Sequence, residues 1–357
     1  MSADLKTLNI CVIGTGLIGT SIALGLKTRG FQVFLRDINE AALVNAAKAS
    51  GAQAWKNETP DLVFVATPPR SVAAVIRETL SAYPNAVVTD VASVKSAIFE
   101  ELENLPKSDL ARVVGGHPMA GREVGGAIGA QGNLFVDRPW VLTKTAATSA
   151  ENYALVSDFV IALGGIPVER SILEHDQAVA LISHTPQVVA SVLAGELLDA
   201  SDSQVELAGQ GIRDTIRIAG SDPELWTEIL GENAKHVATR LSSVAVGLES
   251  FARALLAGDH KQVAEKLSAG NGGRDRLPGK HGTGNKNHAL LVVRVEDKPG
   301  ELARLFQVAA KAKVNLEDVR IDHSLGRMTG LVELSVVTQL RPALTEALES
   351  ATFTVIA

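Results

Sequence analysis

The spacing of apolar residues changes character twice along the chain. From residue 8 to about 168, short β-branched runs alternate with helical segments, which is the pattern of βαβ units. The runs are apolar on both faces, as strands of a parallel sheet covered by helices must be. They occupy residues 8–13, 32–35, 62–66, 86–89 and 112–114. The pattern predicts an α/β domain over residues 1–170, with a doubly wound parallel sheet.

Between residues 171 and 268 the β-branched runs disappear, and Ala, Leu, Glu and Gln recur at three- and four-residue intervals. This periodicity predicts an all-helical domain. One apolar stripe of a late helix packs either in the core of that domain or at a dimer interface; its residues are Leu241, Val244, Leu248, Phe251 and Leu255.

Residues 269–287 are rich in glycine and carry more basic than acidic side chains, which predicts a linker. Its positive charge either keeps it solvated or lets it approach anionic ligands. After it, strands are expected at 288–295, 314–322, 331–337 and 352–356, with helices at 299–312 and 342–350 and a turn at 325–327. The order βαββαβ predicts a small α+β module over residues 288–357.

Composition is that of an ordinary globular protein of two to three domains. The 357 residues include 34 basic and 40 acidic side chains, a net charge of −6, which gives no sign of nucleic-acid binding. The one cysteine, Cys11, cannot form an internal disulfide, so a reducing, cytoplasmic location is expected. The first residues lack the basic-then-apolar order of a signal peptide. Polar residues interrupt the most apolar stretch, 178–198, so we expect a buried helix there and no membrane span.

A dinucleotide-binding motif follows the first predicted strand directly. In GTGLIG, Gly14 permits a tight turn, Gly16 lets the backbone approach a pyrophosphate, and Gly19 allows close packing of helix on strand. Leu17 and Ile18 begin the helix, whose free N–H groups face the anion. The motif in this context predicts a Rossmann-type NAD(P) site, followed by the helical domain and the α+β module.

The end of the second predicted strand bears on cofactor choice. Asp37 stands where a carboxylate can bind the adenosine ribose and repel a 2′-phosphate, which favours NAD. Arg36 beside it could pair with that phosphate, so NADP remains the alternative. Thr67 and Pro68 close the third strand and are expected to line the cofactor cleft or to form a simple turn.

Candidate chemistry lies just past the expected ends of two later strands, in VASVK at 91–95 and GGHPMAG at 115–121. His117, among glycines and a proline, is poorly placed for core packing. It is well placed to accept a proton from an alcohol while hydride leaves for nicotinamide. No metal is expected.

These motifs together resemble the prephenate/arogenate dehydrogenases of tyrosine biosynthesis. The resemblance covers nearly the whole chain and adds SHTP at 183–186 and RDTIR at 213–217, which runs into SDPELW. It implies NAD(P)-dependent oxidative decarboxylation, of prephenate to 4-hydroxyphenylpyruvate or of arogenate to tyrosine, in a homodimer built on the helical domain.

The resemblance also implies roles for individual residues. His117 matches the base on the ring hydroxyl, Ser93 the serine beside it, and Arg217 the arginine that holds a substrate carboxylate. Glu123 and Asp214 match acidic partners in the surrounding ionic network. If residues 212–219 are helical, Arg213 shares a face with Arg217, and Asp214 could orient Arg217 or belong to a solvated face.

One position departs from the bacterial enzymes of the family. Gln187 stands where they carry a second histidine, three residues after His184. A neutral amide can bind a substrate carbonyl or carboxylate but offers no negative charge to the ammonium of arogenate, so we expect prephenate to be preferred. His184 lines the pocket or packs within its helix.

DKPGELA at 297–303 and KVNL at 313–316 resemble the ACT domain, which binds regulatory amino acids in many pathway enzymes. The resemblance implies an effector pocket around Gly300 and Asn315, with L-tyrosine as the natural effector. The alternative is a module that only dimerises.

Two other classes of protein share parts of this pattern. A β-hydroxyacid dehydrogenase would use a helical lysine as its acid/base group, but nothing recommends Lys235, and the C-terminal module would be unexplained. A regulator could combine a nucleotide site and an amino-acid site without turnover. Replacing His117 by Asn distinguishes an enzyme from such a sensor.

Overall fold

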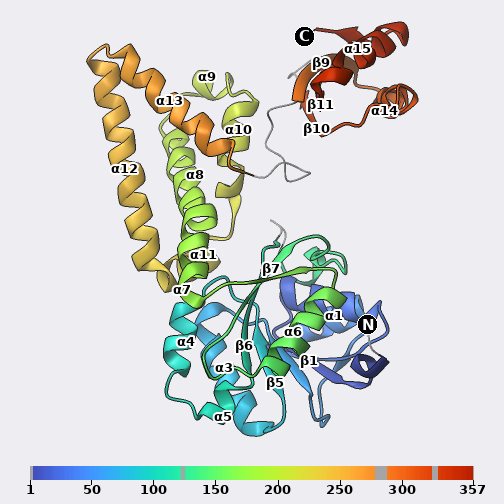
Figure 1. Ribbon diagram of the computed structural model, residues 1–357, viewed down its shortest axis with the longest axis vertical. Coiled ribbons are helices and arrows are strands. Elements are labelled where there is room, and N and C mark those ends of the chain that lie inside the picture. Colours follow the sequence, from blue (N-terminus) through green and yellow to red (C-terminus); the bar gives the residue numbers. More distant parts are fainter. Residues whose placement is uncertain (1–2, 122–124, 278–287, 324–328, 357) are drawn as a thin grey trace. The chain divides into compact units, whose positions relative to one another are not determined.

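The computed structural model describes residues 3–121, 125–277, 288–323 and 329–356. The chain divides into two compact units, Met1–Ala245 and Val246–Ala357, and each is described by itself. Figure 1 shows the order of their elements along the chain.

An eight-stranded sheet forms the centre of the first unit, in the order β3-β2-β1-β4-β5-β6-β7-β8. Each of the five runs read from the sequence is found as a strand. The strands are β1 (Asn9–Ile13), β2 (Gln32–Arg36), β3 (Gln53–Ala54), β4 (Leu62–Val65), β5 (Val87–Asp90), β6 (Val113–Pro118), β7 (Pro139–Thr143) and β8 (Ile166–Glu169).

The five predicted strands pair in parallel, as expected, and the one antiparallel pair involves β7, which the sequence did not predict. β6 and β7 are antiparallel, with His117 opposite Val141. The described part of their connection contains only a 3₁₀ turn, Ala127–Gly129, so no helical crossover returns the chain to the starting edge. β7 and β8 are joined by a helix and are parallel.

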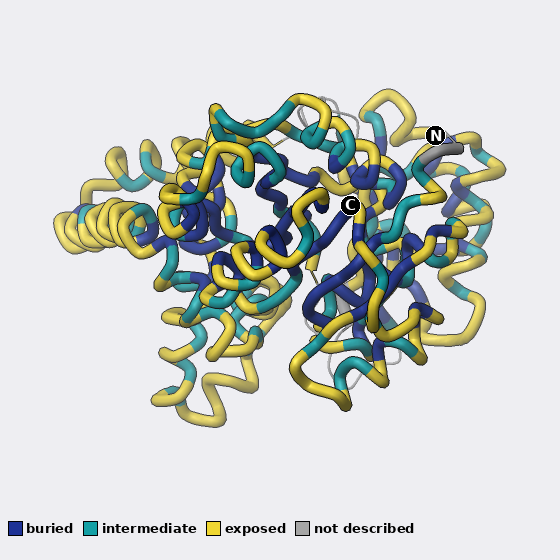
Figure 2. Tube along the Cα trace, turned by 90° about the horizontal axis from the view of Figure 1, so that it is seen from below, coloured by how far each residue is buried: buried dark blue, intermediate teal, exposed yellow. Residues whose placement is uncertain are grey.

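Helices cover both faces of the sheet and enclose two cores. One face packs on α1 (Leu17–Lys27), α2 (Glu40–Ser50) and α6 (Ala150–Ala162), and the other on α3 (Pro69–Ala82) and α4 (Ser96–Leu102). A short helix, α5 (Lys107–Leu110), precedes β6. The central strands β1, β4 and β5 are almost entirely buried because apolar side chains on both sides of them are covered, and Figure 2 draws buried residues in dark blue.

The rest of the first unit is helical, as predicted. The capping box of Ser171 and Glu174 fixes the start of α7. A π-helical turn, Ala180–His184, joins α7 to α8. The helices are α7 (Ile172–Val179), α8 (Thr185–Gly195), α9 (Asp202–Val205), α10 (Gln210–Ile216), α11 (Pro223–Glu232) and α12 (Ala234–Leu256), which runs on into the second unit.

One described helix, Ile172–Leu198, is long and apolar enough to cross a membrane by length and composition, a test that we expected this segment to fail. Four of its polar side chains are nevertheless buried and hydrogen-bonded within the unit. They are His175, Asp176, His184 and Gln187.

The second unit contains α13 (His260–Arg274) and a four-stranded antiparallel sheet in the order β10-β11-β9-β12. α13 continues to Arg274, so the expected linker at 269–287 begins with helix instead of coil. The helix propagates through Gly270, Gly272 and Gly273 because Asp275 N–H still finds Asn271 O, at 3.0 Å. Residues 278–287 lie outside the described part.

The order βαββαβ is found as predicted. β9 (His288–Glu296), α14 (Glu301–Lys311), β10 (Asp318–His323), β11 (Thr329–Val337), α15 (Arg341–Ser350) and β12 (Thr354–Val355) follow one another. Alternate residues of β9 and β11 are buried against the two helices, which leaves the other side of the sheet partly exposed. The expected turn at 325–327 lies outside the described residues.

Candidate functional site

The glycine turn between β1 and α1 has the geometry of an anion cradle. Gly14 has φ +97°, and a Cβ on it would lie 2.4 Å from Ala66 O; a Cβ on Gly19 would lie 1.9 Å from Gly14 O. Both positions therefore require glycine. Gly16 is the N-cap of α1, has no side-chain cap, and has open space where a Cβ would be. Leu17 and Ile18 form the first turn, so their N–H groups are available to a phosphate.

Asp37 stands at the end of β2 beside this turn. Its Oδ2 accepts hydrogen bonds from the amide and the hydroxyl of Thr15, each at 2.7 Å, and its Oδ1 accepts from Asn39 N at 2.8 Å. Burial alone would raise the pKa of Asp37, but these hydrogen bonds lower it below its ordinary value. Asp37 is thus a fixed negative charge. Arg36 points to another partner, Glu78, with 2.8 Å between Nη2 and Oε1.

Thr67 supplies an independent test of whether a cofactor fits. Its backbone nitrogen would lie 2.8 Å from a Cβ on Gly14, so it borders the glycine turn. Its hydroxyl oxygen is buried and has no hydrogen-bond partner among the described residues. An orphaned buried hydroxyl at this place fits a ligand with polar groups. Pro68 is the N-cap of α3 and is exposed. The residues present fit a dinucleotide.

His117 lies within β6, not beyond its end as the sequence suggested. Gly115 and Gly116 belong to the strand, and both positions require glycine because there is no room for a side chain: a Cβ on Gly115 would lie 2.2 Å from Thr143 Oγ1, and one on Gly116 2.5 Å from Asp90 O. The half-buried His117 imidazole is thereby brought to the same sheet edge as the glycine turn. Three strand spacings separate β1 from β6, roughly 14 Å.

A chain of hydrogen bonds runs from His117 into the helical part of the unit. His117 Nδ1 is 2.8 Å from His175 Nε2, and His175 Nδ1 is 2.7 Å from Asp176 Oδ1. The two imidazole rings meet edge to face, with centroids 5.1 Å apart. Asp176 in turn accepts from Lys95 N at 2.9 Å and from Ser96 N at 2.7 Å. α7 is thus joined to the loop after β5.

That loop is held by a buried ion pair. Lys95 Nζ donates to Asp90 Oδ1, and both side chains are fully buried. Asp90 also accepts hydrogen bonds from Ala92 N at 2.8 Å and from Gly116 N at 3.4 Å. Ser93 is half-buried on the same loop, between buried neighbours. The ion pair therefore connects the loop that carries Ser93 to the strand that carries His117.

The surroundings of the three histidines keep their imidazoles neutral. We call the connected side chains the His117 cluster; they are His117, His175, Asp176, Lys95, Asp90, His184 and Asn233. Burial lowers the pKa of His117 well below its ordinary value, and the nearby Lys95 ammonium acts in the same direction. Burial likewise lowers the pKa of His175, and that of His184 to about 4. Burial would raise the pKa of Asp176, but hydrogen bonds from His175 and Ser96 lower it to about 2. At neutral pH His117 can accept a proton, and Asp176 is a carboxylate.

His184 is held at the end of the π-helical turn, a feature often found at functional sites. Its Nδ1 is 3.2 Å from Asn233 Nδ2, which also donates to Asp176 O at 2.9 Å. The ring meets Trp226 edge to face, with centroids 6.0 Å apart. Gln187 donates to Ile218 O at 3.0 Å and so supports the 3₁₀ turn Arg217–Gly220.

The predicted cationic residues lie on the exposed surface of this helical segment. α10 ends at Ile216, and Arg217 begins the 3₁₀ turn, so residues 212–219 are not one helix as supposed. Arg213 donates to Ala208 O at 3.5 Å, and Asp214 accepts from Gln210 at 2.7 Å. The expected role of Asp214 in orienting Arg217 stays a prediction. Glu123 lies outside the described residues.

Several residues of the cluster were missed by sequence reasoning. His175 and Asp176 form an adjacent His-Asp pair in the first turns of an apolar helix, which was the available signal. Lys95 belongs to the motif VASVK, but the sequence alone indicates no role for its side chain. Nothing in the sequence distinguishes Asn233. Among the described residues, no group of three or more His, Cys, Asp and Glu is arranged to hold a metal ion.

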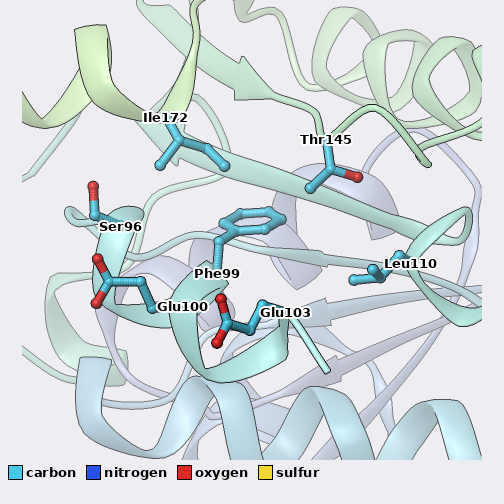
Figure 3. A pocket seen from close by; sticks show the side chains of 7 residues that line it. All are labelled: Ser96, Phe99, Glu100, Glu103, Leu110, Thr145 and Ile172. Carbon is cyan, nitrogen blue, oxygen red and sulfur yellow. The ribbon is translucent and has the colours of Figure 1, made fainter. Parts of the chain in front are cut away.

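A separate hollow of about 410 Å³ lies on α4 and the start of α7, and Figure 3 shows its lining. Phe99 forms its centre, with Ile172 and Thr145 on one side and Glu100 and Glu103 on the other. None of the predicted site residues lines it. The candidate site is therefore the His117 cluster and the glycine turn, not this hollow.

Taken together, the fold and the site define a nucleotide-dependent dehydrogenase with a helical second segment. Two family models match the chain: "Prephenate dehydrogenase, nucleotide-binding domain" over residues 22–168 and "Prephenate dehydrogenase, dimerization domain" over residues 172–269. The chain belongs to the prephenate dehydrogenase family, whose members are NAD-dependent oxidoreductases.

Individual relatives agree with this. The chain is 35% identical over 337 residues to the probable prephenate dehydrogenase NovF of Streptomyces niveus, covering 91% of this chain and 93% of the relative. It resembles the structure of prephenate dehydrogenase from A. aeolicus in complex with hydroxyphenyl propionate and NAD+ (28% identity, TM-score 0.68, 75% of this chain and 97% of that one). It also resembles Synechocystis arogenate dehydrogenase (31% identity, TM-score 0.65, 75% and 99%).

Proposed function

We propose that this protein catalyses the NAD-dependent oxidative decarboxylation of prephenate to 4-hydroxyphenylpyruvate, a step of tyrosine biosynthesis. The observation that carries the proposal is the neutral, half-buried His117 imidazole at the sheet edge where the glycine turn also lies. A base beside a dinucleotide site is what oxidation of an alcohol requires.

The cofactor would be held by the N–H groups of the turn 14–19, by Asp37 at its ribose and by the Thr67 hydroxyl. When bound, it supplies a nicotinamide ring that accepts the hydride from C4 of the substrate. His117 Nε2 takes the proton of the C4 hydroxyl as the carbonyl forms. Loss of carbon dioxide then gives an aromatic phenol, which makes the overall reaction irreversible.

We also propose which side chains position the substrate. Ser93, on the loop held by Lys95, is proposed to hydrogen-bond near the reacting hydroxyl. Arg217, with Arg213 near it in sequence, is proposed to bind a substrate carboxylate, since a guanidinium fork matches that group. His184 is proposed to line the pocket. Glu123 and Asp214 are assigned to the ionic network around Arg217.

The substrate is proposed to be prephenate in preference to arogenate. Gln187 is neutral, is buried, and donates its amide to Ile218 O, so it supplies no negative charge for an ammonium group. The test compares kcat/KM for both substrates, with NAD and with NADP, by absorbance of the reduced nicotinamide. A higher kcat/KM for arogenate refutes the preference, and no turnover of either substrate refutes the function.

A second candidate, arogenate dehydrogenase, is favoured by one observation, the 31% identity to the Synechocystis enzyme. The same assay decides between them, because prephenate and arogenate differ only in the group that the site meets as a carbonyl or as an ammonium.

The protein is proposed to be a homodimer through its helical segment. Several apolar side chains of α8 and α12 are exposed, including Val192 at 63%, Leu248 at 64% and Leu255 at 60%. Leu248 and Leu255 belong to the stripe that we assigned to a core or a dimer interface. Their exposure supports the dimer, as does the match to a dimerization domain. Light scattering after size-exclusion chromatography measures the assembly, and a monomer contradicts it.

The C-terminal module is proposed to be an ACT domain that binds L-tyrosine. Gly300 adopts φ +94° and caps α14, so its turn needs glycine, while Asn315 donates to Glu317 at 2.9 Å. Dehydrogenase rates at rising L-tyrosine test the effector. Unchanged activity at millimolar L-tyrosine leaves the module as a dimerising element.

The location is proposed to be cytoplasmic, with the helix Ile172–Leu198 inside the protein. If that helix crossed a bilayer, the buried hydrogen bonds of His175, Asp176 and His184 would be lost. Fractionation of cells expressing the tagged chain tests this, and recovery in the membrane pellet contradicts it.

A further inference from the structure

The hydrogen bonds behind His117 form a continuous chain that ends on a carboxylate. We propose that His175 and Asp176 are positioning residues that hold His117 in the one tautomer able to act as the base. This inference rests on the proposed function, because it assigns a task to groups behind the same imidazole.

The tautomers follow from the end of the chain. Asp176, with its pKa lowered to about 2, is ionised and can only accept hydrogen bonds. Its Oδ1 lies 2.7 Å from His175 Nδ1, so that nitrogen must carry the hydrogen. In a neutral His175, Nε2 is then the acceptor, and the 2.8 Å contact requires His117 Nδ1 to donate. His117 Nε2 is left with its lone pair free.

Asp176 is itself fixed, so the chain cannot easily invert. The backbone N–H groups of Lys95 and Ser96 donate to its two oxygens, at 2.9 Å and 2.7 Å. A side chain that accepts three hydrogen bonds within a buried site has no freedom to rotate. The orientation therefore passes from the loop after β5 through Asp176 and His175 to His117.

The chain also fits the charge that appears during the reaction. The substrate O–H bond breaks, an N–H bond forms at His117 Nε2, and the hydride leaves separately for the nicotinamide. His117 is then an imidazolium whose Nδ1–H still donates to His175, with the Asp176 carboxylate behind it. The proton does not need to move along the chain.

Other charges near His117 affect its protonation. Lys95, paired with Asp90, disfavours a positive charge on the ring, while Asp176 favours it. Asp176 is thus the carboxylate that offsets the nearby cation, and its removal is expected to move the acid limb of the kcat/KM profile to lower pH.

The test compares two substitutions of His175. Leucine cannot accept a hydrogen bond from His117 Nδ1, so H175L is expected to lower kcat roughly 100- to 1000-fold with the Kd for NAD unchanged. Glutamine carries an acceptor oxygen and a donor amide, so H175Q is expected to keep kcat within roughly tenfold of the parent. H260L, at an exposed histidine that begins α13, is the matched control.

A merely structural role for His175 predicts a different pattern. Equal kcat in H175L and the parent, or equal losses in H175L and H175Q, overturns the proposal. D176N adds the pH profile: an acid limb at the same pH as in the parent also overturns it. Melting temperatures and NAD binding identify any variant that fails to fold.

A readout without turnover separates this proposal from the proposed function. In the full-length protein labelled with ¹⁵N-histidine, the ring of His117 is expected to be protonated at Nδ1 and not at Nε2. Protonation at Nε2 overturns the inference even in an active enzyme. If neither prephenate nor arogenate is oxidised but His117 shows the Nδ1–H form, the function fails and the positioning chain stands.

Discussion

Replacing Lys95 by methionine tests how much the buried ion pair beside the site contributes to the free energy of unfolding. Lys95 and Asp90 are fully buried and paired with each other. Methionine has similar length but no charge, so K95M leaves the Asp90 carboxylate buried without its counter-ion. Among the described residues, the N–H groups of Ala92 and Gly116 would still donate to it. Breaking a buried pair in this way costs about 3–5 kcal/mol.

The loss is measured on the unit that contains the pair. All three tryptophans, Trp55, Trp140 and Trp226, lie in Met1–Ala245, so tryptophan fluorescence during urea unfolding follows that unit. K95M is expected to lower the free energy of unfolding by about 3–5 kcal/mol. The double variant with D90N should recover part of the loss, because no unpaired charge remains. A loss under about 1 kcal/mol, typical of an exposed pair, would refute the reasoning.

Three further outcomes are expected. H117N should lose dehydrogenase activity roughly 100-fold or more while binding NAD with unchanged Kd, measured by calorimetry; unchanged activity would favour a sensor. D37A should raise the ratio of kcat/KM for NADP to that for NAD, since it removes a fixed negative charge from the ribose site; a constant ratio would contradict that role. The folded pKa of His184, about 4, lies below its ordinary 6.5, so the unfolded chain binds more protons between these values. Stability should therefore fall as pH is lowered through this window, by about 3 kcal/mol, and H184Q should flatten the urea-derived profile.

The sequence predicted the parts of the fold that depend on local pattern. Apolar runs located five strands, and the glycine turn was identified from the spacing of its glycines directly after the first strand; Gly14 and Gly19 are the two that sterically require glycine. The antiparallel β7 was missed because strand direction depends on how the connection runs in space. α13 extends into the expected linker because an established helix can continue through glycines, whereas a prediction from composition treats glycine as a helix breaker.

The sequence offers a candidate where a residue has a local signature and offers none where a residue acts through others. His117 was proposed from its unusual neighbours, but its partner His175 is 58 positions away and meets it only after folding. Asp176 accepts from Lys95 N, 81 positions away, through a backbone group with no side-chain signature. Such long-range hydrogen bonds are fixed by tertiary structure, which single-sequence patterns do not contain.

The π-helical turn before α8 determines which way the helix faces. His175 and His184 are nine residues apart, so an uninterrupted α-helix, at about 100° per residue, would place them on opposite sides. Both are 1% exposed and contact the same interior, because the wider turn absorbs one residue and rotates α8 by about 100°. Deleting one of the residues 180–183 would preserve the helix but would turn the His184 side chain away from Asn233. The wider turn at this position thus sets the direction of the His184 side chain without changing its neighbours in sequence.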